Sequence, residues 1–209
     1  MFDTDEMQSI TGSHVILVEG KDEVNFIGEL LKTLLFDTTV DIRDVGGKNQ
    51  FKNKLDTLIK TTNWKKVTRV AIIRDADDSY QSAYQSICDS LAHVGLTVPE
   101  QTLSFTSGRP SVGVFIMPNN ADKGNLEDLC LQSISTSAVI ECISNFWDCI
   151  CDRGVQPKNR SKSQVQTYLS TMPETCTSLG RAAIQGHWNF SSPQFNDLKN
   201  FMSDFLTDI

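Results

Sequence analysis

Three short segments that contain Val and Ile, each followed by a turn and an amphipathic segment, constrain the fold of this chain more than any other feature. They cover residues 14–18, 40–45 and 67–74, and the first is almost wholly apolar, as a strand buried on both faces is. After each run, apolar side chains recur at spacings of three and four, which is typical of a helix with one buried face. Three successive strand-turn-helix units predict an α/β protein with three layers, in which helices cover a mainly parallel central sheet.

The pattern changes after residue 96. Short apolar runs at residues 102–105 and 112–117 are separated by the turn-rich stretch 106–110, which predicts a hairpin or irregular strand pair at the end of the sheet. Beyond residue 118 only helical patterns remain, at residues 126–133, 138–151, 163–169, 179–184 and 195–205. We therefore expect an α/β domain at residues 10–120 and a helical extension packed on it at residues 121–209.

The distribution of charge bears on the binding partner. The 209 residues include 19 Lys and Arg against 26 Asp and Glu, a formal net charge of -7, which excludes a simple basic DNA-coating protein. The charges are segregated, however: residues 48–69 carry seven basic side chains and the single acid Asp56, and residues 153–162 carry four basic side chains and no acid. These are two candidate phosphate-contacting tracks, and the alternative is that their lysines are ordinary solvated surface residues.

The sequence also indicates where the protein resides. Its apolar runs are far shorter than the roughly 20 residues of a membrane span, and its first residues are acidic, unlike a secretory or transit peptide. The six cysteines lack the dense spacing of a disulfide scaffold or of zinc knuckles, so we interpret them as reduced thiols. We expect a cytoplasmic protein with no membrane partner.

Carboxylates follow two of the predicted strands. Glu19 comes directly after the first, and Asp75 and Asp77 end the third. Parallel sheets bind ligands at the carboxyl ends of their strands. If residues 75–77 are extended, Asp75 and Asp77 point to the same side, and Glu23, four residues after Glu19, faces the same point. Converging carboxylates have raised pKa values or hold a cation, and hard oxygen ligands favour Mg²⁺ or Mn²⁺.

Taken one at a time, these acids have simpler explanations. Asp22 and Glu23 are favourable charges at a helix N-terminus, and Asp78 with Ser79 forms an ordinary N-cap. The strand-end positions of Glu19 and Asp75 are harder to explain this way, because buried acids there need a charge partner.

The runs Val-Ile-Leu-Val-Glu-Gly-Lys-Asp-Glu (residues 15–23) and Val-Ala-Ile-Ile-Arg-Asp-Ala-Asp-Asp (residues 70–78) resemble the two signature motifs of the Toprim domain. Topoisomerases, bacterial primases, small RNA-maturation nucleases and the overcoming-lysogenization-defect (OLD) nucleases share this domain. Residues 44–49, 124–128 and 186–189 are similar to further segments of OLD-related nucleases and of small Toprim-like proteins of unknown function. The resemblance implies a Toprim-like, Rossmann-like three-layer fold.

The resemblance also implies roles for the acids. Glu19 would ligate metal or shuttle a proton, Asp75 and Asp77 would hold Mg²⁺ or Mn²⁺, and Glu23 would be a further metal ligand. Either Glu127 or Asp128 would complete a second metal site, and our choice is Glu127.

Basic and glycine residues complete the predicted site. We expect Lys123 to stabilise charge during catalysis, and Gly20, Lys48 and Lys52 to contact the substrate. For the lysines, a solvated surface role is the alternative.

The function that these residues and the resemblance predict is Mg²⁺-dependent Toprim-type phosphodiester cleavage, by a nuclease or nickase, on DNA or RNA, with DNA favoured over RNA as the partner. The setting would be a defence or repair system. The sequence contains no G-x-x-x-x-G-K-[ST] phosphate loop, so an ATPase or another protein partner would have to supply any nucleotide-driven step.

Two alternatives stay open. One is a noncatalytic Toprim-like module that binds metal or a protein. The other is a small-molecule phosphohydrolase of the haloacid-dehalogenase type, although that family carries its D-x-D motif on the first strand and this chain carries it on the third.

Overall fold

The computed structural model describes residues 9–34, 36 and 38–207. The strands are β1 (His14–Val18), β2 (Val40–Asp44), β3 (Arg69–Asp75) and β4 (Ser111–Met117). The helices are α1 (Lys21–Lys32), α2 (Phe51–Ile59), α3 (Tyr80–His93), α4 (Leu126–Ser133), α5 (Ala138–Asp152), α6 (Arg160–Leu169), α7 (Leu179–Ile184) and α8 (Asn196–Leu206), with short 3-10 turns at Trp64–Lys66 and Pro193–Phe195. Among the described residues, no helix is long and apolar enough to cross a membrane.

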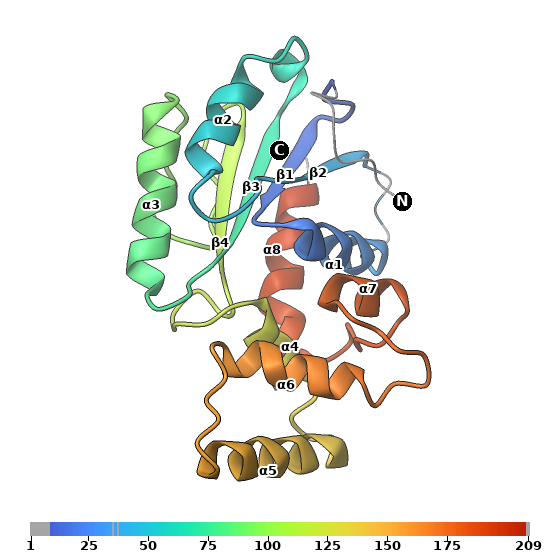
Figure 1. Cartoon of the computed structure of the whole chain (residues 1–209). Coiled ribbons are helices and arrows are strands. Elements are labelled where there is room, and N and C mark those ends of the chain that lie inside the picture. The colour runs from blue at the N-terminus through green and yellow to red at the C-terminus, as the bar shows by residue number, and fades with distance from the viewer. Residues whose placement is uncertain (1–8, 35, 37, 208–209) are drawn as a thin grey trace.

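The four strands form one sheet in the order β2-β1-β3-β4 (Figure 1). Every neighbouring pair is parallel. Leu17 of β1 lies opposite Ile72 of β3, so the residues that follow these two strands meet at one edge of the sheet. The α/β class and the parallel sheet expected from the apolar runs are confirmed.

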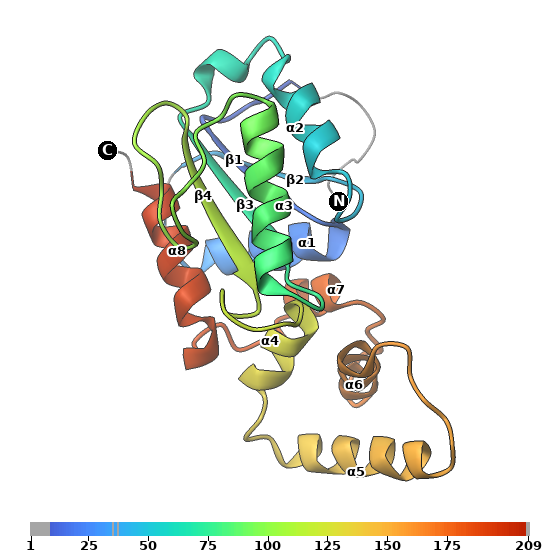
Figure 2. The same ribbon diagram turned by 90° about the vertical axis from the view of Figure 1, so that its left-hand side faces the viewer.

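Helices cover both faces of the sheet, which makes the fold a Rossmann-like arrangement of three layers (Figure 2). Alternate strand residues point to opposite faces. Val15 and Leu17 belong to the apolar cluster that α2 and α3 cover, whereas Ile16 and Val18 belong to the cluster that α1 and α8 cover. Both faces are therefore buried at β1, β3 and β4, which explains their long apolar runs, whereas the edge strand β2 is only partly buried and carries polar residues.

The hairpin or irregular strand pair expected at residues 102–117 is confirmed in its irregular form. Residues 103–106 run antiparallel to β4: the Leu103 N–H donates to the Val114 carbonyl at 3.1 Å, the Thr106 N–H donates to the Val112 carbonyl at 2.9 Å, and Phe105 forms an isolated bridge to Gly113. The Phe105 ring stacks on Phe201 of α8, with ring centroids 5.0 Å apart, and it fills the space that a Cβ at Gly113 would need. Strand β4 itself joins the sheet in parallel with β3.

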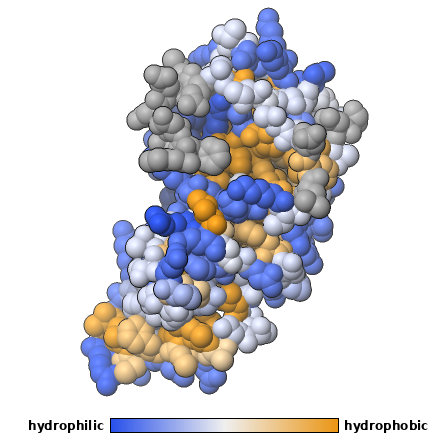
Figure 3. Space-filling view, turned by 90° about the vertical axis from the view of Figure 1, so that its right-hand side faces the viewer, coloured by the Kyte–Doolittle hydropathy of each residue, from blue (hydrophilic) through white to orange (hydrophobic). Residues whose placement is uncertain are grey.

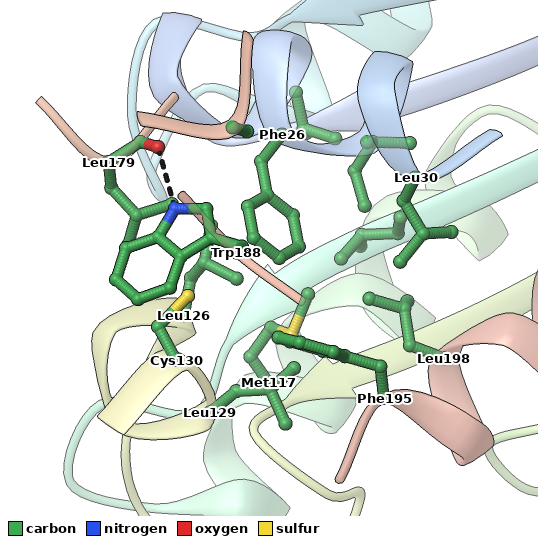
Figure 4. Packing of buried hydrophobic residues seen from close by; sticks show 14 of the residues in the cluster. Phe26, Leu30, Met117, Leu126, Leu129, Cys130, Leu179, Trp188, Phe195 and Leu198 are labelled. Atoms are coloured by element: carbon green, nitrogen blue, oxygen red, sulfur yellow. Dashed lines mark hydrogen bonds between the residues drawn. The ribbon is translucent and has the colours of Figure 1, made fainter. Parts of the chain in front are cut away.

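The C-terminal helices share the core of the sheet. One buried cluster joins Phe26 of α1, Met117 of β4 and Leu198 of α8 (Figure 4). Trp188 lies in the same cluster and donates its indole N–H to the carbonyl of Leu179 at 3.1 Å. The division into residues 10–120 and 121–209 stays a prediction, and residues 208 and 209 lie outside the described range.

The start of α6 also differs from the expectation. The sequence pattern predicted a loop through residue 162, but the helix begins at Arg160. The Asn159 side chain explains this, because it accepts a hydrogen bond from the backbone N–H of Lys162 at 2.9 Å and so caps the first turn.

Gly180 permits the close approach of α7 to α1. A Cβ at this position would lie 2.5 Å from the carbonyl oxygen of Asp22 and 2.8 Å from its Cα. We expect Gly180→Ala to lower the free energy of unfolding by about 1–3 kcal/mol, because the backbones must separate. Gly28→Ala is the matched control: its Cβ would meet only the Ile42 Cδ1, at 3.8 Å, and should be neutral or stabilising by up to about 1 kcal/mol. Urea denaturation measures both, and equal effects would contradict the packing argument.

Candidate functional site

Five carboxylates gather where β1, β3 and α4 meet. We call Glu19, Glu23, Asp75, Asp77 and Glu127 the acid cluster. Glu19 directly follows β1, Asp75 is the last residue of β3, and Glu127 lies in the first turn of α4. Repulsion from the other four carboxylates contributes to raising the pKa of Asp75, so the structure brings together the acids that the sequence singled out.

Glu19 is held by the end of β3. Its Oε1 accepts a hydrogen bond from the backbone N–H of Asp75 at 3.2 Å and lies 3.8 Å from Nε of Arg74. Burial raises the pKa of Glu19 from its ordinary 4.5 to about 7, against the opposing effects of the Asp75 N–H and the Arg74 guanidinium. A carboxyl with such a pKa exchanges its proton near neutral pH.

Asp75 is the most deeply buried acid of the cluster. Its Oδ1 accepts a hydrogen bond from the backbone N–H of Leu126 at 3.1 Å, at the N-terminus of α4. Burial, followed by repulsion from Glu19, holds the pKa of Asp75 well above its usual range. The single hydrogen bond from the N–H of Leu126 therefore compensates only a small part of the free-energy cost of ionising Asp75.

Asp77 reaches the cluster through a turn, so the expectation of an extended stretch at residues 75–77 is wrong. The strand ends at Asp75, and Asp77 has a φ of 52°, in the left-handed region. Its backbone exchanges two hydrogen bonds of 2.8 Å with Gly124, which ties the turn to the loop before α4. The Asp77 carboxylate accepts a hydrogen bond from Nζ of Lys48 at 2.7 Å.

The loop that carries Lys48 is anchored beside Glu19. The backbone N–H of Gly47 donates to the carbonyl of Glu19 at 2.8 Å. Gly46 and Gly47 have φ values of 82° and 113°, a conformation that favours glycine. The Gly-Gly pair therefore lets the chain turn tightly enough to place Lys48 against Asp77.

Glu23 and Glu127 come from the first turns of two helices. Burial raises the pKa of both, and repulsion between them adds to the shift of Glu23. Lys162 of α6 acts in the opposite direction on Glu127. These two residues therefore extend the region of uncompensated negative charge from β1 and β3 to α1 and α4.

Two further acids of the motifs, Asp22 and Asp128, have structural contacts. Asp22 accepts a hydrogen bond from the backbone N–H of Gly180 at 3.3 Å, which links α1 to α7. Asp128 forms a capping box with Asn125 and accepts a hydrogen bond from the hydroxyl of Ser161. The choice of Glu127 over Asp128 as a metal ligand stays a prediction.

The donor chemistry of the acid cluster fits a hard divalent cation, but its present geometry does not enclose one. Carboxylate oxygens are the ligands that Mg²⁺ prefers, and the raised pKa values of four of them show a need for positive charge. Within residues 9–34, 36 and 38–207, no three His, Cys, Asp or Glu side chains converge on one point as metal ligands do. Binding would therefore require side-chain rotation.

An open cavity of about 710 Å³ lies beside the cluster. Acidic side chains on its wall include Asp77 and Asp78, and basic side chains come from three separate segments: Lys48, Lys123 and Arg160. A cavity with carboxylates and convergent cations suits a ligand that carries phosphate and is bound through metal.

Other predicted contacts lie elsewhere. Lys52 is exposed on α2 near Asp56 and does not line the cavity. Gly20 is the N-cap of α1, where a Cβ would approach the Glu23 carboxylate to 3.2 Å. Arg69 is buried, with its guanidinium 5.2 Å from the centre of the Phe105 ring, so its inclusion in a surface track was wrong.

Sequence reasoning missed two contributors to the site. Arg74 was counted only as part of a strand, yet it is buried and faces Glu19. A cation inside an apolar strand next to an acid is the signal that would have found it. Ser161 gave no such signal, because its contact with Asp128 depends on the packing of α6 against α4.

The fold is a three-layer α/β arrangement, and the acid cluster is a candidate ligand site at the carboxyl ends of its strands. The family model described as "Protein of unknown function (DUF3226)" matches residues 13–207, and the chain belongs to this family. No curated protein and no solved structure matches the chain.

Proposed function

We propose that the chain is a Mg²⁺- or Mn²⁺-dependent phosphodiester-cleaving protein of the Toprim type that acts on nucleic acid, on DNA more than RNA. The observation that carries the proposal is the acid cluster, in which burial and mutual repulsion raise the pKa values of Glu19, Glu23, Asp75 and Glu127. The order of the motifs that resemble the Toprim domain supports it further.

The acid cluster would hold the metal, with Asp75 at its centre and Glu19, Glu23, Asp77 and Glu127 around it. When bound, divalent ions polarise the phosphate and lower the pKa of coordinated water. The chain's own contribution is to fix the carboxylates: Leu126 N–H holds Asp75, and Asp75 N–H holds Glu19.

Glu19 is the best candidate for proton transfer. Its pKa of about 7 lies where a general acid or base works most effectively at neutral pH. Arg74 and the N–H of Asp75 limit the orientations of the carboxyl group.

The cations of the cavity would contact phosphate oxygens. Lys48 already forms a hydrogen bond with Asp77, so on substrate binding it would exchange this carboxylate for a phosphate. Lys123 and Arg160 lie on the wall of the same cavity. The negative chain would thus bind a polyanion locally rather than by its net charge.

We further propose a cytoplasmic protein of a defence or repair system, in which an ATPase or other partner supplies any nucleotide-driven step. Six cysteines of the described residues are free thiols, which fits a reducing compartment.

A second candidate is a noncatalytic module that binds metal or a protein partner. The observation that favours it is that no three His, Cys, Asp or Glu side chains of the described residues converge as metal ligands, so the structure contains no preformed catalytic metal centre in these residues. It predicts metal or partner binding with no cleavage.

The test is cleavage of supercoiled plasmid DNA and of RNA by the purified chain with Mg²⁺, Mn²⁺ or EDTA. We expect nicked or linear DNA with Mg²⁺ or Mn²⁺, no product with EDTA, and a rate that declines on acidification as the carboxylates of the acid cluster become protonated. Glu19→Gln should lower the rate at least about 100-fold. Glu29→Gln is the matched control. Glu29 lies on α1, and within the described residues its carboxylate accepts a side-chain hydrogen bond from Lys32 alone.

Each alternative has its own result. Equal rates for Glu19→Gln and Glu29→Gln would refute catalysis at this site. Metal binding without cleavage of either nucleic acid would favour the noncatalytic module. Phosphate release from small phosphoesters alone would favour the phosphohydrolase.

A further inference from the structure

Helix α5 lies at the end of the molecule remote from the sheet (Figures 1 and 2). It packs mainly on α6. Ile143 is buried in this contact, and the indole N–H of Trp147 donates to the Thr167 hydroxyl at 2.9 Å. One face of α5 is thus already used within the chain.

A second apolar stripe on α5 is exposed. It consists of Val139, Cys142, Phe146 and Cys149, all exposed and spaced by three and four residues in turn. Arg153 follows four residues later at the end of the helix, where its guanidinium donates hydrogen bonds to the carbonyl and the thiol of Cys149. Val139 is 37% exposed and Phe146 49%, and Val155 just beyond the helix is 56% exposed. Figure 3 shows hydrophobic surface at this end of the molecule. Alternating spacings of three and four are those of a helix that pairs with another helix.

The charges at the ends of α5 point to an antiparallel partner of the same sequence. Glu141 lies in the first turn and Arg153 at the C-terminal end. Neither has an oppositely charged partner within 4.0 Å in the described part of the chain. An antiparallel second copy would bring Glu141 of one helix to the end that carries Arg153 of the other, and would oppose the two helix dipoles favourably.

The two charges set the register of such a pair. Residues 141 and 153 have their midpoint at 147. A two-fold axis at the level of Trp147 therefore pairs them, and it places the two Phe146 side chains next to the axis. Self-complementarity of this kind is what an isologous interface requires.

We infer that α5 is a homodimerisation helix, which pairs in antiparallel fashion with α5 of a second copy through the stripe from Val139 to Cys149. A single 15-residue helix offers a small interface, so the dimer forms reversibly and depends on concentration. This inference does not rest on the proposed function.

The first test is sedimentation equilibrium of the full chain over a range of concentrations. The wild type should pass from monomer to dimer as concentration rises, and Phe146→Glu should stay monomeric at every concentration because it places two carboxylates near the axis. Ile184→Glu is the matched control, since Ile184 is 55% exposed on α7. It should dimerise like the wild type, and thermal melting confirms that both variants are folded. The inference would be overturned if the wild type stayed monomeric or if Phe146→Glu still formed a dimer. A monomeric wild type would mean that the stripe binds a different protein.

The second test distinguishes antiparallel from parallel pairing with a short bismaleimide. With a rise of about 1.5 Å per residue, the two Cys149 residues would be offset by about 6 Å along the helix axis and the two Cys142 residues by about 15 Å. Cys142→Ser should therefore still cross-link into dimers, whereas Cys149→Ser should do so much less. Equal cross-linking of the two variants would contradict the antiparallel arrangement.

Discussion

Asp75→Asn is expected to abolish metal-dependent cleavage and, at the same time, to stabilise the metal-free protein at pH 8. The carboxyl group of Asp75 is buried among four other acids, and its pKa is well above the usual range because burial and repulsion oppose its charge. Asparagine has the same shape without the charge, and its amide oxygen can accept the N–H of Leu126 as Oδ1 does now. Removal of the charge therefore relieves a cost of folding while it removes a central metal ligand.

The expected effects are large and of opposite sign. The cleavage rate should fall at least about 100-fold, the scale of losing one main electrostatic group of an active site. The free energy of unfolding should rise at pH 8 without metal, and Tm should rise with it, because burial and repulsion no longer oppose a charge at this position. Plasmid cleavage measures the first effect, and thermal unfolding in EDTA measures the second.

Asp56→Asn is the matched control. Asp56 is an exposed acid on α2 whose pKa is lowered by its hydrogen bond to Lys60, so its loss should leave cleavage unchanged and should not stabilise the protein. An Asp75→Asn protein that is both less stable and inactive would assign the residue a structural role. An active Asp75→Asn protein would refute the proposed function outright.

The sequence predicted the sheet well because its strands carry a strong local signal. Residues such as Ile16 and Ile72 lie in uninterrupted apolar runs, and a strand buried on both faces requires such a run whatever surrounds it. The strand-end position of Asp75 followed directly, since it is set by where the run stops.

What failed depended on contacts between distant segments. The sequence pattern did not show that the Phe105 ring occupies the space beside Gly113 and stacks on Phe201, while its backbone pairs only irregularly with β4. Arg69 reads as a surface cation, but the Phe105 ring covers it. Local pattern carries no information about either partner.

The candidate site shows the same division. Glu19 and Asp75 were identified because they end adjacent strands, whereas the turn that positions Asp77 depends on its two hydrogen bonds to Gly124. The contact of Asp128 with Ser161 likewise depends on how α6 packs against α4, which the local sequence pattern does not reveal.

The metal-free protein should lose stability as the pH rises from 5 to 8. Burial raises the pKa of Glu19 from 4.5 to about 7, so between these values the folded protein retains a proton that the unfolded chain has released. Because the unfolded state then binds fewer protons, the free energy of unfolding falls with increasing pH. The contribution of Glu19 to the free energy of unfolding is complete below about pH 4.5 and is lost above about pH 7. It amounts to about 3 kcal/mol at most. The raised pKa values of Asp75, Glu23 and Glu127 act in the same direction.

Bound Mn²⁺ or Mg²⁺ should reverse this trend, because a cation compensates the charges that destabilise the folded state at high pH. We expect the gain in Tm on adding Mn²⁺ to be small at pH 5 and large at pH 8, with protons released on binding at intermediate pH. Unfolding by urea at several pH values, with Mn²⁺ or with EDTA, measures both slopes. Glu19→Gln should flatten the metal-free slope and Glu29→Gln should leave it unchanged. If Mn²⁺ stabilised the protein equally at pH 5 and pH 8, the ion would be bound by groups other than these carboxylates. A metal-free stability that rises with pH would mean that the acid cluster is already neutralised within the folded chain.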